Sequence, residues 1–397
     1  MKIMHHENES VQEDGSSVWT TSFLFLNLSF FMVFANTALF YIYPLALDHM
    51  GSGHHIVGLV MGIFSTAAVL SRPFLGKLVG LKGESWVMSS GLALNMGVCL
   101  AYNLIEEFGP AMLAVRTLHG IGFSAFISGG FSLAAKVFPP AKRGEAFSVL
   151  GACLMGTVAL APPFGEFLVG RWGFGSLYIT ASGSLLLAWV CLRIVKEHLK
   201  ESTYEHTKTP VKYLGLLKDR AFCLLLISTI IFAHCQATVP NFLALLAAGK
   251  GGNSGRFFMF SYFTAILFLL AMGRFIDRFG MRLFLVVAYP FFLLGIFLIP
   301  SSLPSFYFLF PAVLYGAGIG LLFPAHNAAA AGHGNEMQKP AYMSLFTAVY
   351  DAGFITGGVV SGWFAQKTSL DMLFTTCSVF GLLGFGVVIL LSKTRME

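Results

Sequence analysis

The sequence predicts an all-α membrane protein in which twelve transmembrane helices form two bundles of six. Three observations predict this fold. Of the 397 residues, 56% are hydrophobic and 11% are charged, whereas a soluble domain carries about 25% charged residues. The apolar residues lie in long continuous runs, which favour helices over barrel strands, whose apolar and polar residues alternate. The two halves of the chain also resemble each other.

Each apolar run is long enough to cross a bilayer, which takes about 20 residues. The expected helices cover residues 18–47, 55–80, 85–104, 110–138, 142–170, 174–195, 218–248, 256–278, 281–301, 303–331, 338–367 and 370–391. The bundles therefore span 18–195 and 218–392, and a charged linker, 196–217, joins them. Residues 1–17 and 393–397 are polar tails, and the long run after the first tail argues against a cleaved signal peptide.

The lysines and arginines predict the orientation. With the N-terminus in the cytoplasm, only Arg171, Lys250, Arg256 and Lys367 of the 25 lysines and arginines fall outside, and two more fall within helices. This asymmetry satisfies the positive-inside rule. We therefore expect both termini in the cytoplasm and the protein in a bacterial cytoplasmic membrane. The net charge of +6 reflects this topology, so nothing supports nucleic-acid binding.

Nearly constant offsets relate the two halves. Glycines 76 and 83, after the second helix, match glycines 273 and 280 at an offset of 197 residues. Glycines 120 and 122 in the fourth helix match 316 and 318 at an offset of 196, and Ala146 matches Ala341 at 195. Such offsets indicate a duplication, which is common in secondary transporters whose substrate site lies between the halves.

Three motifs carry a family resemblance. The stretch Gly273-Arg-Phe-Ile-Asp277-Arg278-Phe-Gly280 resembles the loop signature of the major facilitator superfamily, Arg116-x-x-His119-Gly-x-Gly resembles its helix 4 motif, and Ala161-Pro-Pro-Phe-Gly165 resembles the helix 5 motif of its antiporters. The resemblance covers essentially the whole chain. It implies the major facilitator fold, alternating access and a conformational gate at the two loops, formed by Gly76, Gly83, Gly273, Asp277, Arg278 and Gly280.

The sequence departs from the family pattern at two places. Gly80 stands in the first loop where the family usually has an acidic residue, which puts a charge lock on that side in doubt. The helix 4 motif more often carries glutamine where this chain has His119.

Arg116 lies deep in an apolar run, where an unpaired guanidinium would cost anything from about 3 to more than 10 kcal/mol. Glu166 lies at a comparable height in the fifth helix, so we expect Arg116 and Glu166 to form an ion pair. This pair is either purely structural or part of a proton-coupling site in which Glu166 takes and gives the proton. His119, one turn from Arg116, is a further candidate for proton coupling.

Two more helices carry polar residues near mid-membrane. His234, Gln236 and Asn241 cluster in the seventh helix, and Tyr350 and Asp351 in the eleventh. His234 and Asp351 are proton-site candidates, since both titrate and both are buried. Each has a structural alternative, packing for the histidine and a hydrogen bond for the aspartate. We expect Arg72, near the end of the second helix, to extend toward the cytoplasm or to pair at the loop.

The expected substrate site combines residues from both bundles, namely Asn36, Tyr43, Arg116, His234, Gln236, Asn241 and Tyr350. Asn36 and Tyr43 are two helical turns apart and share a face, which suits a cavity wall, although Asn36 could instead bond a neighbouring helix. His49, His54 and His55 crowd the first outer turn, where a solvated loop is favoured over a metal site.

These features predict a secondary active transporter rather than an enzyme. No phosphate-binding G-x-x-x-x-G-K-[ST] motif, metal site or catalytic spacing is present, so we expect no cofactor. Buried titratable groups and the antiporter-like motif favour a proton-coupled exporter of a small amphipathic or zwitterionic metabolite, drug or metal-chelating compound, acting as a monomer. The alternatives are a proton-coupled importer of an organic anion, with Arg116 as its clamp, and a non-transporting membrane receptor.

Overall fold

A computed structural model describes residues 18–138, 142–197, 213–279, 281–303, 305–335 and 338–393, with only the backbone of 196–197, 213–214, 272–279 and 281–282. Within these residues, twelve helices are long and apolar enough to cross a membrane. The prediction of twelve membrane-spanning helices is thereby confirmed, and the chain is an integral membrane protein.

The first group of helices comes from the N-terminal half. It contains α1 (Thr21–Leu39), η1 (Phe40–Ile42), α2 (Tyr43–His49), α3 (His54–Lys82), α4 (Glu84–Ala101), η2 (Tyr102–Leu104), α5 (Pro110–Val137), α6 (Arg143–Trp172) and α7 (Phe174–Glu197). The expected ends are correct to within a few residues. The first span is not one continuous helix, because Pro44 opens α2 and cannot donate the backbone hydrogen bond that would continue α1.

The second group comes from the C-terminal half. It contains α8 (Tyr213–Leu216), α9 (Arg220–Gly249), α10 (Ser254–Phe279), α11 (Met281–Ser302), η4 (Phe306–Phe308), α12 (Leu309–Ala331), α13 (Lys339–Lys367) and α14 (Leu370–Lys393). Prolines interrupt neither α6 nor α9, since Pro162, Pro163 and Pro240 all lie inside continuous helices.

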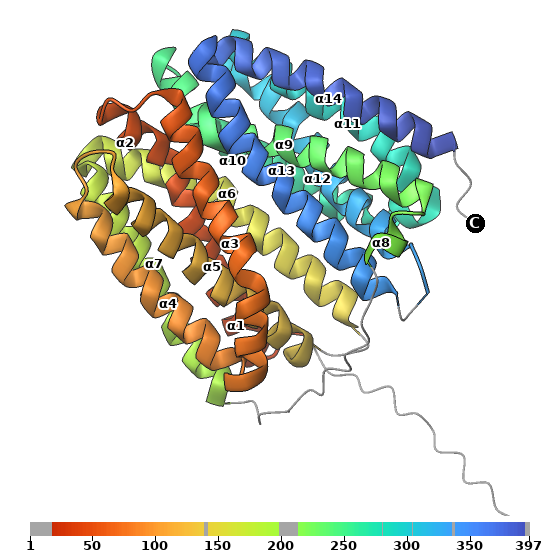
Figure 1. Cartoon of the computed structure of the whole chain (residues 1–397), viewed down its shortest axis with the longest axis horizontal. Coiled ribbons are helices and arrows are strands. Elements are labelled where there is room, and N and C mark those ends of the chain that lie inside the picture. Colours follow the sequence, from red (N-terminus) through yellow and green to blue (C-terminus); the bar gives the residue numbers. More distant parts are fainter. Residues whose placement is uncertain are drawn as a thin grey trace, which may run out of the picture.

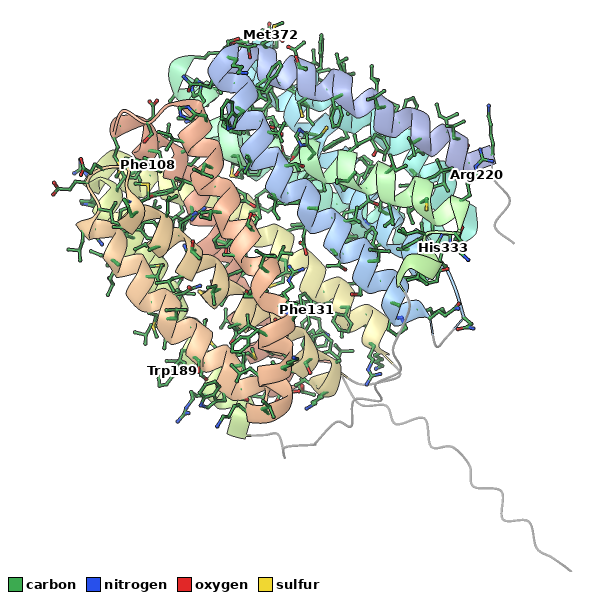
Figure 2. The ribbon with its side chains drawn as sticks, in the orientation of Figure 1. Phe108, Phe131, Trp189, Arg220, His333 and Met372 are labelled. Carbon is green, nitrogen blue, oxygen red and sulfur yellow. The ribbon has the colours of Figure 1, made fainter. Side chains whose placement is uncertain are left out.

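The helices run between two ends of the molecule, which we name the His49 end and the Gly83 end after a residue at each. Phe108 and Met372 lie at the His49 end, whereas Arg220 and His333 lie toward the Gly83 end (Figure 2). Figure 1 shows the two groups of helices meeting near α2 and diverging toward the opposite end.

Three sets of contacts join the two bundles. Helix α3 packs on α13, α6 packs on α10, and α2 with η1 packs on α9. The α3–α13 contact begins at the His49 end, where Gly58 and Gly62 lie against Gly358 and its neighbours. The bundles are therefore closed against each other at the His49 end.

The packing of equivalent glycines supports the duplication. Gly120 of α5 lies against the carbonyl of Phe64 in α3, and Gly316 of α12 lies against the carbonyl of Ser261 in α10. Phe64 and Ser261 are themselves 197 residues apart, the offset that relates the loops after these helices. A side chain at either glycine would collide with a backbone, so both glycines serve close helix packing.

Candidate functional site

An ion pair joins the two bundles part of the way through the membrane. Arg72 Nη1 of α3 donates to Asp351 Oδ2 of α13. The side chains are 33% and 16% exposed, respectively, so neither is fully buried. The expectation that Arg72 extends to the cytoplasm or pairs at the loop is wrong, because its partner is a mid-membrane acid on the opposite bundle.

The signal for this pair was present in the sequence. Arg72 and Asp351 are opposite charges within long apolar runs, and charges at such depth need partners. What the sequence lacked was a reason to place the second helix against the eleventh.

Polar residues of the second bundle form a network beside Asp351. The Tyr350 hydroxyl donates to Gln236 Oε1 at 2.8 Å, and the Tyr315 hydroxyl donates to the Gln236 carbonyl at 3.4 Å. His234 Nδ1 lies 3.1 Å from the Thr356 hydroxyl. The structure therefore brings together Gln236 and Tyr350, and places His234 on the same helix pair, α9 with α13.

Aromatic rings surround this network. Tyr41 of η1 contacts Phe258 of α10 across the bundles, with ring centroids 5.4 Å apart. Phe323 and Phe354 both lie 5.1 Å from the ring of Tyr350. The surroundings of Gln236 and Asp351 thus combine a few hydrogen-bonding groups with much apolar surface, as in binding sites for organic molecules.

Arg116 lies inside the first bundle rather than on a surface that faces the second, and it is 3% exposed. Its Nε donates to the Val60 carbonyl at 3.2 Å, and its guanidinium carbon lies 4.9 to 5.4 Å from the ring centroids of Phe64, Phe40 and Tyr43. Its Nη1 has no hydrogen-bond partner. Aromatic faces, which attract cations, therefore take the place of an acid.

The predicted ion pair between Arg116 and Glu166 is wrong for this structure. Among the described residues, no ion pair includes Arg116. Glu166 Oε1 instead accepts from the Ser254 hydroxyl and, at 3.0 Å, from the Gly255 N–H of the second bundle. Equal depth in the membrane did not settle the pairing, since the direction in which each side chain points from its helix decides its partner.

His119 belongs to a buried network whose hydrogen positions follow from its neighbours. Asn36 Nδ2 donates to the Ala181 carbonyl at 3.0 Å, which makes Asn36 Oδ1 an acceptor. His119 Nε2, 3.0 Å away, must therefore carry the hydrogen, and Nδ1 accepts from the Tyr102 hydroxyl at 3.3 Å. The network holds His119 as one neutral tautomer.

Two residues expected in a cavity wall are buried instead. Asn36 is 1% exposed and Tyr43 is 0% exposed. Asn36 bonds α7 and His119, and the Tyr43 ring contacts Arg116, so the cavity-wall prediction is wrong for this conformation. The alternative for Asn36, a bond to a neighbouring helix, describes what the structure shows.

The remaining candidates are distributed as follows. Asn241 is half-buried in α9. At the Gly83 end, Gly76 lies within α3, and no atom lies within 4 Å of a Cβ built on it. Gly83, with φ of 83°, separates α3 from α4. Gly280 lies outside the described residues, and Gly273, Asp277 and Arg278 belong to a stretch of which only the backbone is described.

No metal cluster of three or more His, Cys, Asp or Glu side chains occurs within the described part of the chain. His54 Nδ1 instead lies 3.4 Å from the Ala365 carbonyl of α13, and the ring of His55 contacts Trp363. Two of the three histidines of the outer turn therefore contact the opposite bundle.

Comparison with known proteins extends this picture. The sequence model of the Major Facilitator Superfamily matches residues 25–255 and 253–396. The chain is 27% identical over 344 residues to the multi-drug resistance efflux pump PmrA of Streptococcus pneumoniae, a match that covers 80% of this chain and 81% of the pump.

Two solved structures share the fold. The nucleoside transporter NupG superposes with a TM-score of 0.75 at 12% identity, over 95% of this chain and 100% of that one. A bacterial homolog of the human lysosomal transporter Spinster, inward-facing and occupied, superposes with a TM-score of 0.76 at 13% identity, over 96% and 98% of the two chains. At these identities the likeness concerns the fold alone.

Proposed function

Because this chain belongs to the Major Facilitator Superfamily, we propose that it is a proton-coupled exporter that works by alternating access. Its cargo is a small amphipathic or zwitterionic compound, a class that includes drugs and metal-chelating metabolites. The observation that carries the proposal is the ion pair between Arg72 and Asp351, which joins the bundles at a partly exposed position.

Asp351 offers a physical basis for antiport. When ionised it holds Arg72 across the bundle interface, and a proton on Asp351 removes that attraction. A cationic group of a substrate competes for the same carboxylate. Binding of a proton to the Asp351 carboxylate then prevents binding of the substrate there, and the reverse, so that each promotes the release of the other. Glu166 and His234 are secondary candidates for proton binding.

The residues around Asp351 support an amphipathic substrate. Gln236 and Tyr350 provide hydrogen bonds, while the neighbouring phenylalanines provide apolar contact, and Asn241 and His234 share the same helix, α9. Four further candidates are buried within the first bundle and would affect substrate binding indirectly, through the shape of that bundle: Arg116, His119, Asn36 and Tyr43. The name of the related pump, which describes multi-drug efflux, supports export.

The positive-inside pattern supports a location in the bacterial cytoplasmic membrane, with residues 1–17, 196–217 and 393–397 in the cytoplasm. The His49 end then faces outward. In this orientation the bundles are closed on the outside, which is the state that loads an export substrate from the cytoplasm.

Transport by the purified full chain in proteoliposomes tests the proposal, with ethidium as an amphipathic cation and norfloxacin as a zwitterion. An imposed pH gradient should drive either probe against the direction of proton flow. Asp351→Asn should lower this transport at least about tenfold and should also weaken counterflow of labelled ethidium, because the variant removes the carboxylate that would bind its cationic group. Asp371→Asn is the matched control, because Asp371 pairs with Lys250 within one bundle.

Each alternative gives a different result. Accumulation of a probe in the direction of proton flow would contradict export and would favour the organic-anion importer. Buried Arg116 offers no clamp in this conformation, so nothing in the geometry favours that function. Absence of counterflow for every probe would favour a receptor that does not transport.

A further inference from the structure

Two of the contacts that close the His49 end are equivalent to each other in the two halves of the chain. A Cβ placed on Gly58 would lie 2.5 Å from the Gly358 carbonyl, and one placed on Gly255 would lie 2.5 Å from Pro163 Cα. Gly58 and Gly255 are 197 residues apart, and Pro163 and Gly358 are 195 apart. These are the offsets of the duplication in the same helices, so α3 on α13 and α10 on α6 are equivalent interfaces.

Only one of the two interfaces carries a carboxylate at this end. Ser361 occupies the position equivalent to Glu166, and Val57 occupies the position equivalent to Ser254. The Ser361 hydroxyl is bonded to Thr238 at 2.8 Å, within its own bundle. Glu166 instead reaches across to the opposite bundle, so this contact is specific to one interface and is not required by the fold.

The carboxylate of Glu166 meets the N-terminus of α10. Asn253, the residue directly before α10, caps the helix, since its Oδ1 accepts from the Arg256 N–H at 2.7 Å. Glu166 Oε1 accepts from the Gly255 N–H, which the helix itself leaves unpaired, and from the buried Ser254 hydroxyl. Helix N-termini stabilise negative charge, so ionised Glu166 acts as a second cap supplied by the other bundle.

The second oxygen of Glu166 distinguishes the two protonation states. Glu166 Oε2 is buried and has no hydrogen-bond partner among the described residues. Oε1 is already occupied by two donors, so a proton would reside on Oε2 as a buried donor without an acceptor. Such a group is costly, and separation of the bundles would allow water to bond it.

The charged surroundings of Glu166 are simple. Helix α6 packs on α10, α1, η1 and α7. Of these, α1 and η1 contain no charged residue, and the charges of α7 lie at the Gly83 end, as do those of α10 other than Arg256. Arg256 directly follows Gly255 in α10. Tyr41 of η1, whose ring contacts Phe258 of α10, and Tyr178 of α7 are further titratable side chains at this end, and Arg171 lies five residues beyond Glu166 in α6.

We infer that Glu166 is a proton-operated latch of the His49 end. Ionised Glu166 caps α10 and holds the bundles together, and protonated Glu166 releases α10 and lets the end open. Glu166 is thus a positioning residue that acts through α10, distinct from Asp351. Only the role of this opening in transport rests on the proposed function, because the closure of the His49 end is measured without a substrate.

Distances between spin labels test the latch in the full chain, reconstituted in nanodiscs after replacement of the six native cysteines. Labels replace Trp172 and Tyr307, which are 62% and 79% exposed at the His49 end. At pH 8 the parent should show mainly a short distance, and acidification to pH 5 should transfer population to a longer one. Glu166→Gln should lower the ratio of closed to open molecules about three- to thirty-fold at pH 8 and reduce the response to pH to the part that comes from Asp351, which the double variant Glu166→Gln with Asp351→Asn should remove.

Two further variants make the test specific. Glu145→Gln, on an exposed residue at the other end of α6, should behave as the parent does. Ser254→Ala removes one donor to Glu166 but leaves the Gly255 N–H, so it should lower the ratio of closed to open molecules by less and keep the response to pH. This variant tests the contact even if Glu166→Gln does not fold.

A parent without a pH response, or a Glu166→Gln variant whose response is as large as that of the parent, would overturn the inference. A latch that responds as expected in a protein that transports nothing would refute the proposed function and leave the latch in place.

Discussion

His119 of α5 donates its Nε2–H to Asn36 Oδ1 of α1 across 3.0 Å, and both residues are fully buried. His119→Ala would leave that oxygen without a donor, and we expect it to lower the free energy of unfolding by about 1–3 kcal/mol. His119→Gln keeps an N–H donor of similar reach and should cost less than half as much. Unfolding in detergent measures both, and equal losses would contradict the hydrogen-bond assignment.

Arg116 carries a positive charge that no acid in the described part of the chain neutralises. Arg116→Met keeps the length and apolar contact of the side chain and removes the cost of burying the charge. We expect its thermal unfolding temperature to equal or exceed that of the parent, whereas Arg116→Ala, which leaves a cavity, should unfold earlier. A Met variant as unstable as the Ala variant would show that the Val60 and aromatic contacts outweigh the burial cost.

Gly120 has no room for a side chain, because a Cβ would collide with the Phe64 carbonyl. We expect Gly120→Ala to push α5 away from α3 and to lower the free energy of unfolding by about 1–3 kcal/mol. Gly97→Ala is the matched control, since nothing lies within 4 Å of a Cβ there. The control should be neutral or stabilising by up to about 1 kcal/mol, the gain in helix propensity. Similar losses at both sites would contradict close packing at Gly120.

Tyr350 holds the Gln236 side chain through a 2.8 Å hydrogen bond. Tyr350→Phe releases the amide without changing the shape of the ring, so we expect the KM for a transported probe to rise several-fold with little change in maximal rate. Tyr307→Phe, on a hydroxyl that is exposed in η4, is the control. A fall in maximal rate at constant KM would instead assign Tyr350 to the conformational change.

The fold was predictable because its signals are local and repeated. Continuous apolar runs determine the twelve helices, and the glycine offsets indicate the duplication from the sequence alone. The 3-10 turn before Pro44 was not predicted, since the apolar run continues through it without a change in composition. Pro44 itself was the available signal.

Partners in the site were harder to predict than the residues themselves. Arg72 and Asp351 lie 279 residues apart, and only the docking of α3 on α13 brings them together. Arg116 and Glu166 were paired by depth, a coordinate along the membrane normal that carries no information on rotation about the helix axis. The duplication supplies part of what was missing, since equivalent interfaces imply that α3 meets α13 wherever α10 meets α6.

The backbone contact of Gly58 with Gly358 has a kinetic consequence. No side chain stands between the two helices there, so separating them requires no rotamer change and no unlocking of interdigitated groups. The activation enthalpy of opening should then come mainly from polar contacts, namely His54 with Ala365 and Arg72 with Asp351 at this interface and Glu166 with α10 at the other. Arg72 lies about 21 Å along α3 from Gly58, at 1.5 Å per residue, so its contact breaks at a different depth from the other two.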